Sequence, residues 1–199
     1  MVYNEGLNDP FFMLLDDFIY EEKLIDDEIC DQLVQWFVDN KELQHEACSK
    51  NPETDQNEVR PDILLATRSW LQGDAWELLY NTINISVSRY MSETKGWPWQ
   101  YDIESKDYSI REYKKGEGLF DGHIDTATEK TYNRMIAFIL YLNDVEEGGE
   151  TEFIYTGKKI KPTKGKVLMF PCNYLYPHQG NIPLSGDKLI ATAFLYNKF

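Results

Sequence analysis

Residues 188–196 read Lys-Leu-Ile-Ala-Thr-Ala-Phe-Leu-Tyr, a nearly unbroken apolar run with the length of a long β-strand. Similar runs recur through the C-terminal half of the chain and are separated by Gly, Pro and Asn. They occupy residues 108–113, 135–143, 151–155 and 167–170. Short strands with turn residues between them are typical of an antiparallel sandwich or barrel, and not of alternating strand–helix–strand units.

The first hundred residues have helical periodicity instead. Asp26 or Asp27 is a suitable N-cap for a helix that ends near Asn40. A second helix is predicted from about Gly73 to Thr94, and each helix should pack one apolar face against a larger element. The expected stripe of the second helix consists of Trp76, Leu79, Ile83, Val87 and Tyr90.

These two halves predict a mainly β fold with flanking helices. We expect a double-stranded β-helix, or jelly roll, over residues 101–199, packed by helices from a support region of residues 1–100. The join lies near Gly96-Trp97-Pro98. A chain of 199 residues fits a single domain, residues 1–199, and is too short for two independent enzyme units. One active site is therefore expected.

The charge balance argues against nucleic acid as a partner. The chain has 34 acidic and 20 basic residues, which gives a formal net charge of −14. A surface this negative repels phosphate backbones. The longest apolar stretches, such as Met135 to Leu142, are far shorter than the roughly 20 residues that cross a bilayer, so no membrane span is expected.

The cysteines and the start of the chain favour a cytoplasmic protein. Cys30, Cys48 and Cys172 are widely separated and odd in number, and we interpret them as reduced structural thiols. The first residues, Met-Val-Tyr-Asn-Glu-Gly, have neither the basic nor the apolar region of a secretory signal. The sequence leaves the oligomeric state open.

Three polar segments receive structural interpretations. Residues 50–61 form either a lid or, as the simpler interpretation, an exposed connector. The run Glu146-Glu-Gly-Gly-Glu150 is interpreted as a turn and not as a cation-binding loop, because its glycines permit positive φ. The lysine-rich residues 158–166 are expected to form a hairpin at a sheet edge. His45 has no partner in spacing and is assigned no role.

Two of the three histidines lie in the β half in a pattern that suggests a metal site. In His123-Ile-Asp125 the two polar side chains stand at i and i+2, so in an extended segment they project to the same side. His178 follows 53 residues after Asp125, and a rolled-up sheet can bring it beside the pair. Two imidazoles and one carboxylate form the facial triad of oxygen-activating ferrous iron and leave three positions open. Because a lone His-x-Asp is common, the pattern needs support from other residues.

Lys188 and Thr192 provide that support. Lys188 opens the strand described first, and a cation that points into an apolar barrel is costly unless it is paired. A buried Lys188 therefore predicts an anionic ligand. Thr192, four residues later, lies on the same face by strand alternation and can donate its hydroxyl to the same ligand.

Taken together, several motifs resemble the prolyl 4-hydroxylase branch of the 2-oxoglutarate and iron(II) dioxygenases. The resemblance covers about residues 106–196 and is specific in both order and spacing. The motifs are Tyr113-Lys-Lys-Gly116, Phe120-Asp-Gly-His-Ile-Asp125, Tyr141-Leu-Asn-Asp-Val-Glu-Glu-Gly-Gly-Glu-Thr151, Pro162-Thr-Lys-Gly165, Phe170-Pro171, His178 and Lys188.

The resemblance implies a role for each matched residue. His123, Asp125 and His178 would bind Fe(II) and form the catalytic centre. The 2-oxoglutarate cosubstrate would be bound through its distal carboxylate by Lys188, with hydrogen bonds from Tyr141 and Thr192, and Tyr113 would stand at the edge of its pocket. Arg134 matches an arginine on the substrate side of related sites, although an exposed cation at a strand start explains it equally well. O2 would be the oxidant and ascorbate an auxiliary reductant.

The implied activity is hydroxylation of an unactivated C–H bond, with release of succinate and CO2. The resemblance favours a prolyl residue of a peptide or protein as substrate, in a groove that Trp99, Tyr174 and Tyr176 could line. A free amino acid or another small metabolite is the alternative substrate, and a non-catalytic jelly-roll binding module is the alternative class. Oxidative demethylation of nucleic acid is disfavoured by the acidic balance.

Overall fold

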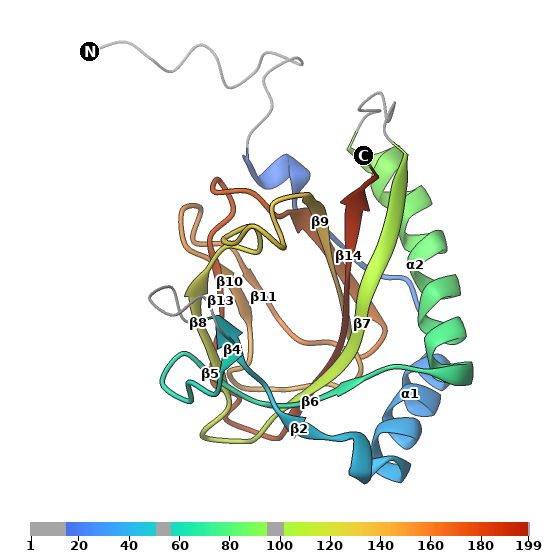
Figure 1. The fold of residues 1–199 in the computed structure, drawn as a ribbon, viewed down its shortest axis with the longest axis vertical. Coiled ribbons are helices and arrows are strands. Elements are labelled where there is room, and N and C mark those ends of the chain that lie inside the picture. The colour runs from blue at the N-terminus through green and yellow to red at the C-terminus, as the bar shows by residue number, and fades with distance from the viewer. Residues whose placement is uncertain (1–14, 51–56, 95–101, 199) are drawn as a thin grey trace.

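The computed structural model describes residues 15–50, 57–94 and 102–198. Two antiparallel sheets face each other, and two helices cover the outer side of the larger sheet (Figure 1). This is the predicted architecture, a jelly-roll core with flanking helices.

The larger sheet has seven strands in the order β1-β12-β9-β14-β7-β6-β2, and every neighbouring pair is antiparallel. The long strands β7, β9 and β14 form its centre. The strands are β1 (Tyr20–Lys23), β2 (His45–Glu46), β6 (Thr67–Trp70), β7 (Ile103–Tyr113), β9 (Arg134–Tyr141), β12 (Lys166–Pro171) and β14 (Lys188–Asn197).

The smaller sheet has five short strands in the order β11-β10-β13-β8-β5. They are β5 (Leu64–Leu65), β8 (Leu119–His123), β10 (Thr151–Phe153), β11 (Lys159–Ile160) and β13 (His178–Gly180). Strands β3 (Ser49–Lys50) and β4 (Asn57–Glu58) form a separate pair, and two 3-10 helices span Leu15–Phe18 (η1) and Lys41–Leu43 (η2).

The two α-helices begin and end within one residue of their predicted bounds. They are α1 (Asp27–Asp39) and α2 (Gly73–Glu93). Leu33 and Leu79 are fully buried, but Trp76 is 37% exposed and stacks on Tyr80, so the expectation that Trp76 belongs to the buried stripe was wrong. Within the described residues, neither α-helix is long and apolar enough to cross a membrane.

Strand alternation divides the apolar residues into two cores. On β9, Phe138 and Leu140 face the helices, whereas Ala137, Ile139 and Tyr141 face the smaller sheet. Successive side chains of a strand point to opposite faces, so each central strand of the larger sheet contributes to both cores. The inner core lies between the sheets, where the cavity described below opens.

The N-terminal part of the chain contributes more β structure than the helical periodicity predicts. Strands β1 and β2 are the two edge strands of the larger sheet, β6 lies between β2 and β7, and β5 is an edge strand of the smaller sheet. These strands have only two to four residues, too few to show a period of two.

Two of the polar segments behave as interpreted, and one is only partly described. Strand β11 lies at a sheet edge, as expected for residues 158–166. Gly148 and Gly149 have φ of 72° and 74° in the turn that contains them. In the segment of residues 50–61, β3 and β4 pair as a hairpin, and residues 51–56 lie outside the described residues, so the lid hypothesis stays a prediction.

Candidate active site

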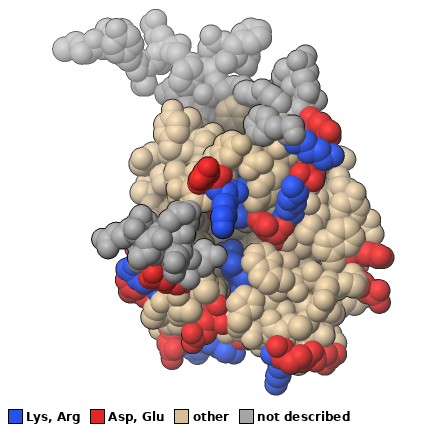
Figure 2. Space-filling model, in the orientation of Figure 1, with Lys and Arg blue, Asp and Glu red and all other residues tan. Residues whose placement is uncertain are grey.

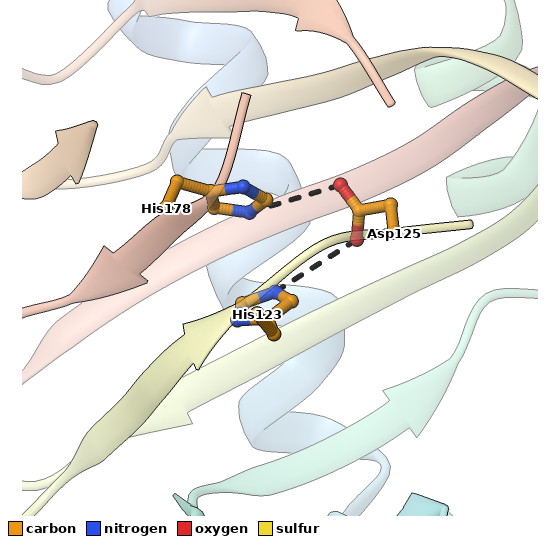
Figure 3. Close-up of side chains that lie close together, drawn as sticks. All are labelled: His123, Asp125 and His178. Carbon is orange, nitrogen blue, oxygen red and sulfur yellow. Dashed lines mark ion pairs between the residues drawn. The ribbon is translucent and has the colours of Figure 1, made fainter. Parts of the chain in front are cut away.

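The structure brings His123, Asp125 and His178 together between the two sheets (Figure 3). His123 ends β8 and His178 begins β13, and the two residues are directly opposite in the register of these strands. Asp125 lies in the turn after β8. Its carboxylate oxygens lie 3.8 Å from His123 Nε2 and 3.7 Å from His178 Nε2. All the candidate ligand atoms lie within 4.8 Å of one another.

Backbone carbonyl groups orient both imidazoles. His123 Nδ1 lies 2.7 Å from the carbonyl oxygen of Asp121, and His178 Nδ1 lies 3.1 Å from that of Tyr176. Because a carbonyl oxygen can only accept, each Nδ1 carries the proton and donates it. The Nε2 lone pairs are therefore directed toward Asp125, the orientation that metal-binding histidines adopt with an outer hydrogen-bond partner.

Aromatic rings restrict the two histidines from the other side. Phe120 stacks on His123 with ring centroids 3.5 Å apart, and Phe170 packs edge-on against His178 at 4.7 Å. Burial lowers the pKa of His123 well below its ordinary value, and the neighbouring His178 adds to this effect. A neutral imidazole is the form that binds metal.

This donor set fits a ferrous ion. Ligand atoms on one side of an ion, each bonded at about 2.0–2.2 Å, stand about 3 Å apart, so the His–Asp distances of 3.8 and 3.7 Å would shorten by less than about 1 Å when the ion binds. Two neutral imidazoles and one carboxylate on one side of the ion leave the other side open. Within the described residues, this is the cluster that meets the spacing of a metal site.

Lys188 stands in the same cavity as a buried cation. It is 2% exposed, its Nζ donates to the carbonyl oxygen of Gly149 at 2.9 Å, and it lies 4.5 Å from the ring centroid of Tyr113. Burial lowers the pKa of Lys188 to about 7, and Glu150 partly opposes that shift. No carboxylate in the described part of the chain forms an ion pair with Lys188. A dianionic ligand would supply the missing charge.

The turn before β10 places the carbonyl group that Lys188 contacts. A Cβ on Gly148 would come within 2.3 Å of the Ile182 carbonyl oxygen, so this position requires glycine. The positive φ of Gly149 then directs its carbonyl oxygen to Lys188. The acidic turn thus contributes a backbone carbonyl group to the contacts of Lys188.

The three residues predicted around the cosubstrate take different positions. Tyr113 and Thr192 line the cavity, and Thr192 Oγ1 lies 3.0 Å from Ser109 Oγ. Tyr141 is fully buried behind the lining, and its hydroxyl donates to Thr151 Oγ1 at 2.7 Å. In this structure Thr151, and not Tyr141, therefore faces the cavity.

Arg134 is held by groups close to the metal ligands. Its guanidinium pairs with Asp107, donates to Tyr196 Oη at 2.7 Å and to the Asp125 carbonyl oxygen at 3.4 Å, and covers the ring of Phe194. The interpretation as an exposed strand-start cation was wrong, because the side chain is 17% exposed and fully engaged. Its predicted contact with substrate stays a prediction.

Arg111 and Thr151 are among the lining residues to which the sequence analysis assigned no role. Both line the cavity that contains the triad and Lys188. Figure 2 shows basic side chains at a hollow on the face that opens between the sheets. The available signal was strand alternation, since Arg111 lies two residues before Tyr113 on the same strand.

The aromatic residues suggested for a substrate groove separate in the structure. Tyr174 is 70% exposed, whereas Tyr176 is 5% exposed and donates to the Leu15 carbonyl oxygen from within the inner core. Trp99 lies outside the described residues. The three cysteines are free thiols, as interpreted.

Comparison with known proteins finds matches over the same part of the chain. Residues 108–196 match the model of the 2OG-Fe(II) oxygenase superfamily. Among named proteins of Arabidopsis thaliana, the chain is 30% identical to Probable prolyl 4-hydroxylase 9, over 45% of this chain and 40% of that protein. It is 27% identical to Probable prolyl 4-hydroxylase 7, over 91% of this chain and 62% of that protein. The chain therefore spans less than two thirds of these relatives.

Solved structures show the same fold at low identity. The viral collagen prolyl hydroxylase of Paramecium Bursaria Chlorella virus-1, solved as a 2OG complex, aligns with a TM-score of 0.69 and 21% identity, over 91% of this chain and 97% of that one. A Trichoplax adhaerens prolyl hydroxylase, solved with a peptide fragment of the hypoxia inducible factor oxygen degradation domain, aligns with a TM-score of 0.71 and 16% identity, over 91% and 84%.

Proposed function

We propose that this protein, whose residues 108–196 match the model of the 2OG-Fe(II) oxygenase superfamily, is a 2-oxoglutarate-dependent dioxygenase that hydroxylates a prolyl residue of a peptide or protein. The observation that carries the proposal is the pairing of two features in one cavity: the triad of His123, Asp125 and His178, and a buried Lys188 without a carboxylate partner in the described ranges. A metal-chelating diacid would satisfy both.

The role of each residue follows from its position. His123, Asp125 and His178 would hold Fe(II), which when loaded with 2-oxoglutarate and O2 supplies the oxidising power for C–H hydroxylation while the cosubstrate is converted to succinate and CO2. Lys188 would bind the distal carboxylate, assisted by the hydroxyl group of Thr192 and the position of Tyr113. Tyr141 would act through Thr151, whose hydroxyl group it holds.

The chain's other contribution is to exclude water. Phe120, Phe170 and the apolar inner core surround the triad, so reacting groups would meet few solvent molecules apart from those admitted with the substrate. The prolyl preference rests on the named relatives and not on a contact in this chain, so the test uses proline-containing peptides.

The test uses the purified chain with Fe(II), ascorbate, 2-oxoglutarate and a panel of proline-containing peptides. Succinate is measured, and mass spectrometry detects the gain of one oxygen atom on proline. We expect both products, and Asp125→Ala should abolish both while Glu117→Ala, an exposed change in the β7–β8 turn, should not.

Other outcomes separate the alternatives. Oxygen gain on free amino acids and on no peptide would assign a small-molecule hydroxylase. Absence of succinate together with absence of iron-dependent 2-oxoglutarate binding would indicate a non-catalytic jelly-roll module and would overturn the proposal.

A cytoplasmic location is also part of the proposal. It is supported by Cys30 and Cys172, which are buried, unpaired thiols as expected in a reducing compartment. Fractionation of cells that produce the protein tests this assignment, and recovery in the secretory pathway would contradict it.

A further inference from the structure

Arg68 and Arg111 form a pair of cations beside the cavity that the proposed chemistry does not use. They are directly opposite each other in the register of β6 and β7. Opposed residues of neighbouring strands project to the same face of a sheet, and Arg111 lines the cavity. The side chain of Arg68 therefore lies on the cavity side of the larger sheet.

Neither arginine has an anionic partner in the described part of the chain. The Nε atom of each is buried and has no hydrogen-bond partner among the residues that the structure describes. Arg134, in the same inner region, has an ion pair with Asp107 and hydrogen bonds to Tyr196 and Asp125. The contrast indicates that the Arg68–Arg111 pair is not a structural ion-pair network.

The pair is electrostatically unfavourable in the absence of a ligand. Like charges directly opposite on neighbouring strands repel each other. Burial and the nearby Arg111 lower the pKa of Arg68 to about 9. Such an arrangement is characteristic of binding sites, where an incoming group of opposite charge relieves the repulsion.

Aromatic rings support both guanidinium groups and set their distance from the metal site. Arg68 Cζ lies 5.0 Å from the ring centroid of Trp70, and Arg111 Cζ lies 5.6 Å from that of Phe120. Phe120 in turn stacks on His123 at 3.5 Å. A ligand of Arg111 would therefore lie within about two to three residues of extended peptide from the metal, at roughly 3.3–3.6 Å per residue.

In the proposed function, neither the metal site nor the cosubstrate neutralises the charges of the two arginines. In the proposed function, Lys188 pairs with the distal carboxylate of 2-oxoglutarate, and the metal is balanced by Asp125 and the chelating carboxylate. Among the described residues, Arg68 and Arg111 then still have no ion-pair partner. Guanidinium groups bind carboxylates through paired N–H donors.

We propose that Arg68 and Arg111 bind a carboxylate of the peptide substrate, supplied by an aspartate or glutamate within two or three residues of the hydroxylated proline. This inference rests on the proposed function and gives it a specificity: the enzyme selects acidic sequences around its target. The two arginines are substrate-binding residues and take no part in metal or cosubstrate binding.

The experiment compares peptides that contain one central proline and one glutamate, moved from three residues before the proline to three residues after it. Each peptide has a glutamine-matched control. With the iron-loaded protein and 2-oxoglutarate, kcat/KM for at least one glutamate position should exceed that of its glutamine match about 10- to 100-fold, the range expected for a charge-assisted hydrogen bond.

Variants assign this preference to the arginines. Arg111→Gln and Arg68→Gln should each reduce kcat/KM for the preferred glutamate peptide about tenfold or more and change that of the glutamine peptide less than about threefold. Arg111→Lys, which keeps the charge, should restore part of the preference. Arg89→Gln, an exposed arginine of α2, is the matched control and should leave the preference intact.

The outcomes separate failure of this inference from failure of the proposed function. If prolines are hydroxylated but glutamate and glutamine peptides react equally, the inference is overturned and the function stands. If no peptide is hydroxylated, anaerobic binding of the same peptides decides: equal binding of both matched forms overturns the inference, and preferential binding of the glutamate form that Arg111→Gln abolishes supports it. A loss in Arg111→Gln that extends equally to the glutamine peptide also contradicts it.

Discussion

The two faces of the larger sheet share strands but have different chemistry. On β14, Leu189, Ala191, Ala193 and Leu195 face the helices and belong to the hydrophobic core on that side. The alternate residues, Lys188 and Thr192 among them, face the cavity. Successive side chains of β14 point to opposite faces of the sheet. The residues on one face therefore stabilise the fold, and those on the other face line the cavity. Substitutions on the two faces should therefore affect different measurements.

The largest effect is expected on the helix-facing side. Leu140→Ala removes a fully buried side chain of β9, and the lost burial and the cavity left behind should lower the free energy of unfolding by about 2–5 kcal/mol. Denaturant unfolding measures this change. The affinity of the folded protein for 2-oxoglutarate should be unchanged, and Leu175→Ala, at a leucine that is 38% exposed, should cost much less. A large loss of cosubstrate affinity in Leu140→Ala would show that the faces are coupled.

The opposite pattern is expected for Lys188→Met, on the cavity side. Loss of the buried cation should raise the Kd for 2-oxoglutarate about 30-fold or more, because a charge-assisted contact is lost. Anaerobic calorimetry with Fe(II) measures it. Pyruvate has the same chelating group without the distal carboxylate, and its affinity should not change. Equal weakening of both ligands would assign Lys188 a purely structural role.

Lys188 should also make the stability of the protein and its affinity for 2-oxoglutarate depend on pH in opposite directions. Its folded-state pKa of about 7 lies below the usual 10.5, so the unfolded chain binds more protons between these values, and the ligand-free protein should become more stable as pH rises from 7. The protonated form binds the dianion, so the Kd for 2-oxoglutarate should rise about tenfold per pH unit above 7.

Calorimetry and thermal unfolding across pH 6–9 test this prediction. Lys188→Met should flatten both trends. A Kd for 2-oxoglutarate that is constant across this range in the unaltered protein would contradict it.

The smallest effect is expected for Ser109→Ala. Its hydroxyl group pairs with Thr192 on the cavity side, and loss of one such hydrogen bond should cost about 0.5–1.5 kcal/mol of stability. The affinity for 2-oxoglutarate should fall less than about tenfold, because the Thr192 hydroxyl group would lose its hydrogen-bond partner. A larger fall would mean that Ser109 itself contacts the ligand.

Sequence patterns predicted the long elements and the residues that those elements carry. Helices α1 and α2 and strands β9, β12 and β14 are long enough for their periodicity to show, and Lys188 is buried, as its predicted role required. The three triad residues were selected by motif. Strand β13, which begins with His178, has only three residues and is invisible to a periodicity argument.

The features that the sequence analysis did not predict depend on the pairing of strands that are far apart in the sequence. Arg68 lies on β6, a strand in the half of the chain that was predicted to be helical. The pairing of β6 with β7, which places Arg68 opposite Arg111, could therefore not be anticipated. The hydrogen bond from Tyr141 to Thr151 likewise depends on how two strands of different sheets face each other. Such contacts are set by tertiary packing and leave no local signature.

The direct opposition of His123 and His178 across β8 and β13 makes strand register a condition for iron uptake. If β13 slipped by one residue along β8, its side chains would change faces and the imidazole of His178 would point out of the molecule. An ion bound by both imidazole rings would hold β8 and β13 in register. The ion that takes part in catalysis would therefore also stabilise the smaller sheet. Amide hydrogens of β8 and β13 should then exchange more slowly in the iron-loaded protein than in the apoprotein, while those of β9 and β14 stay the same.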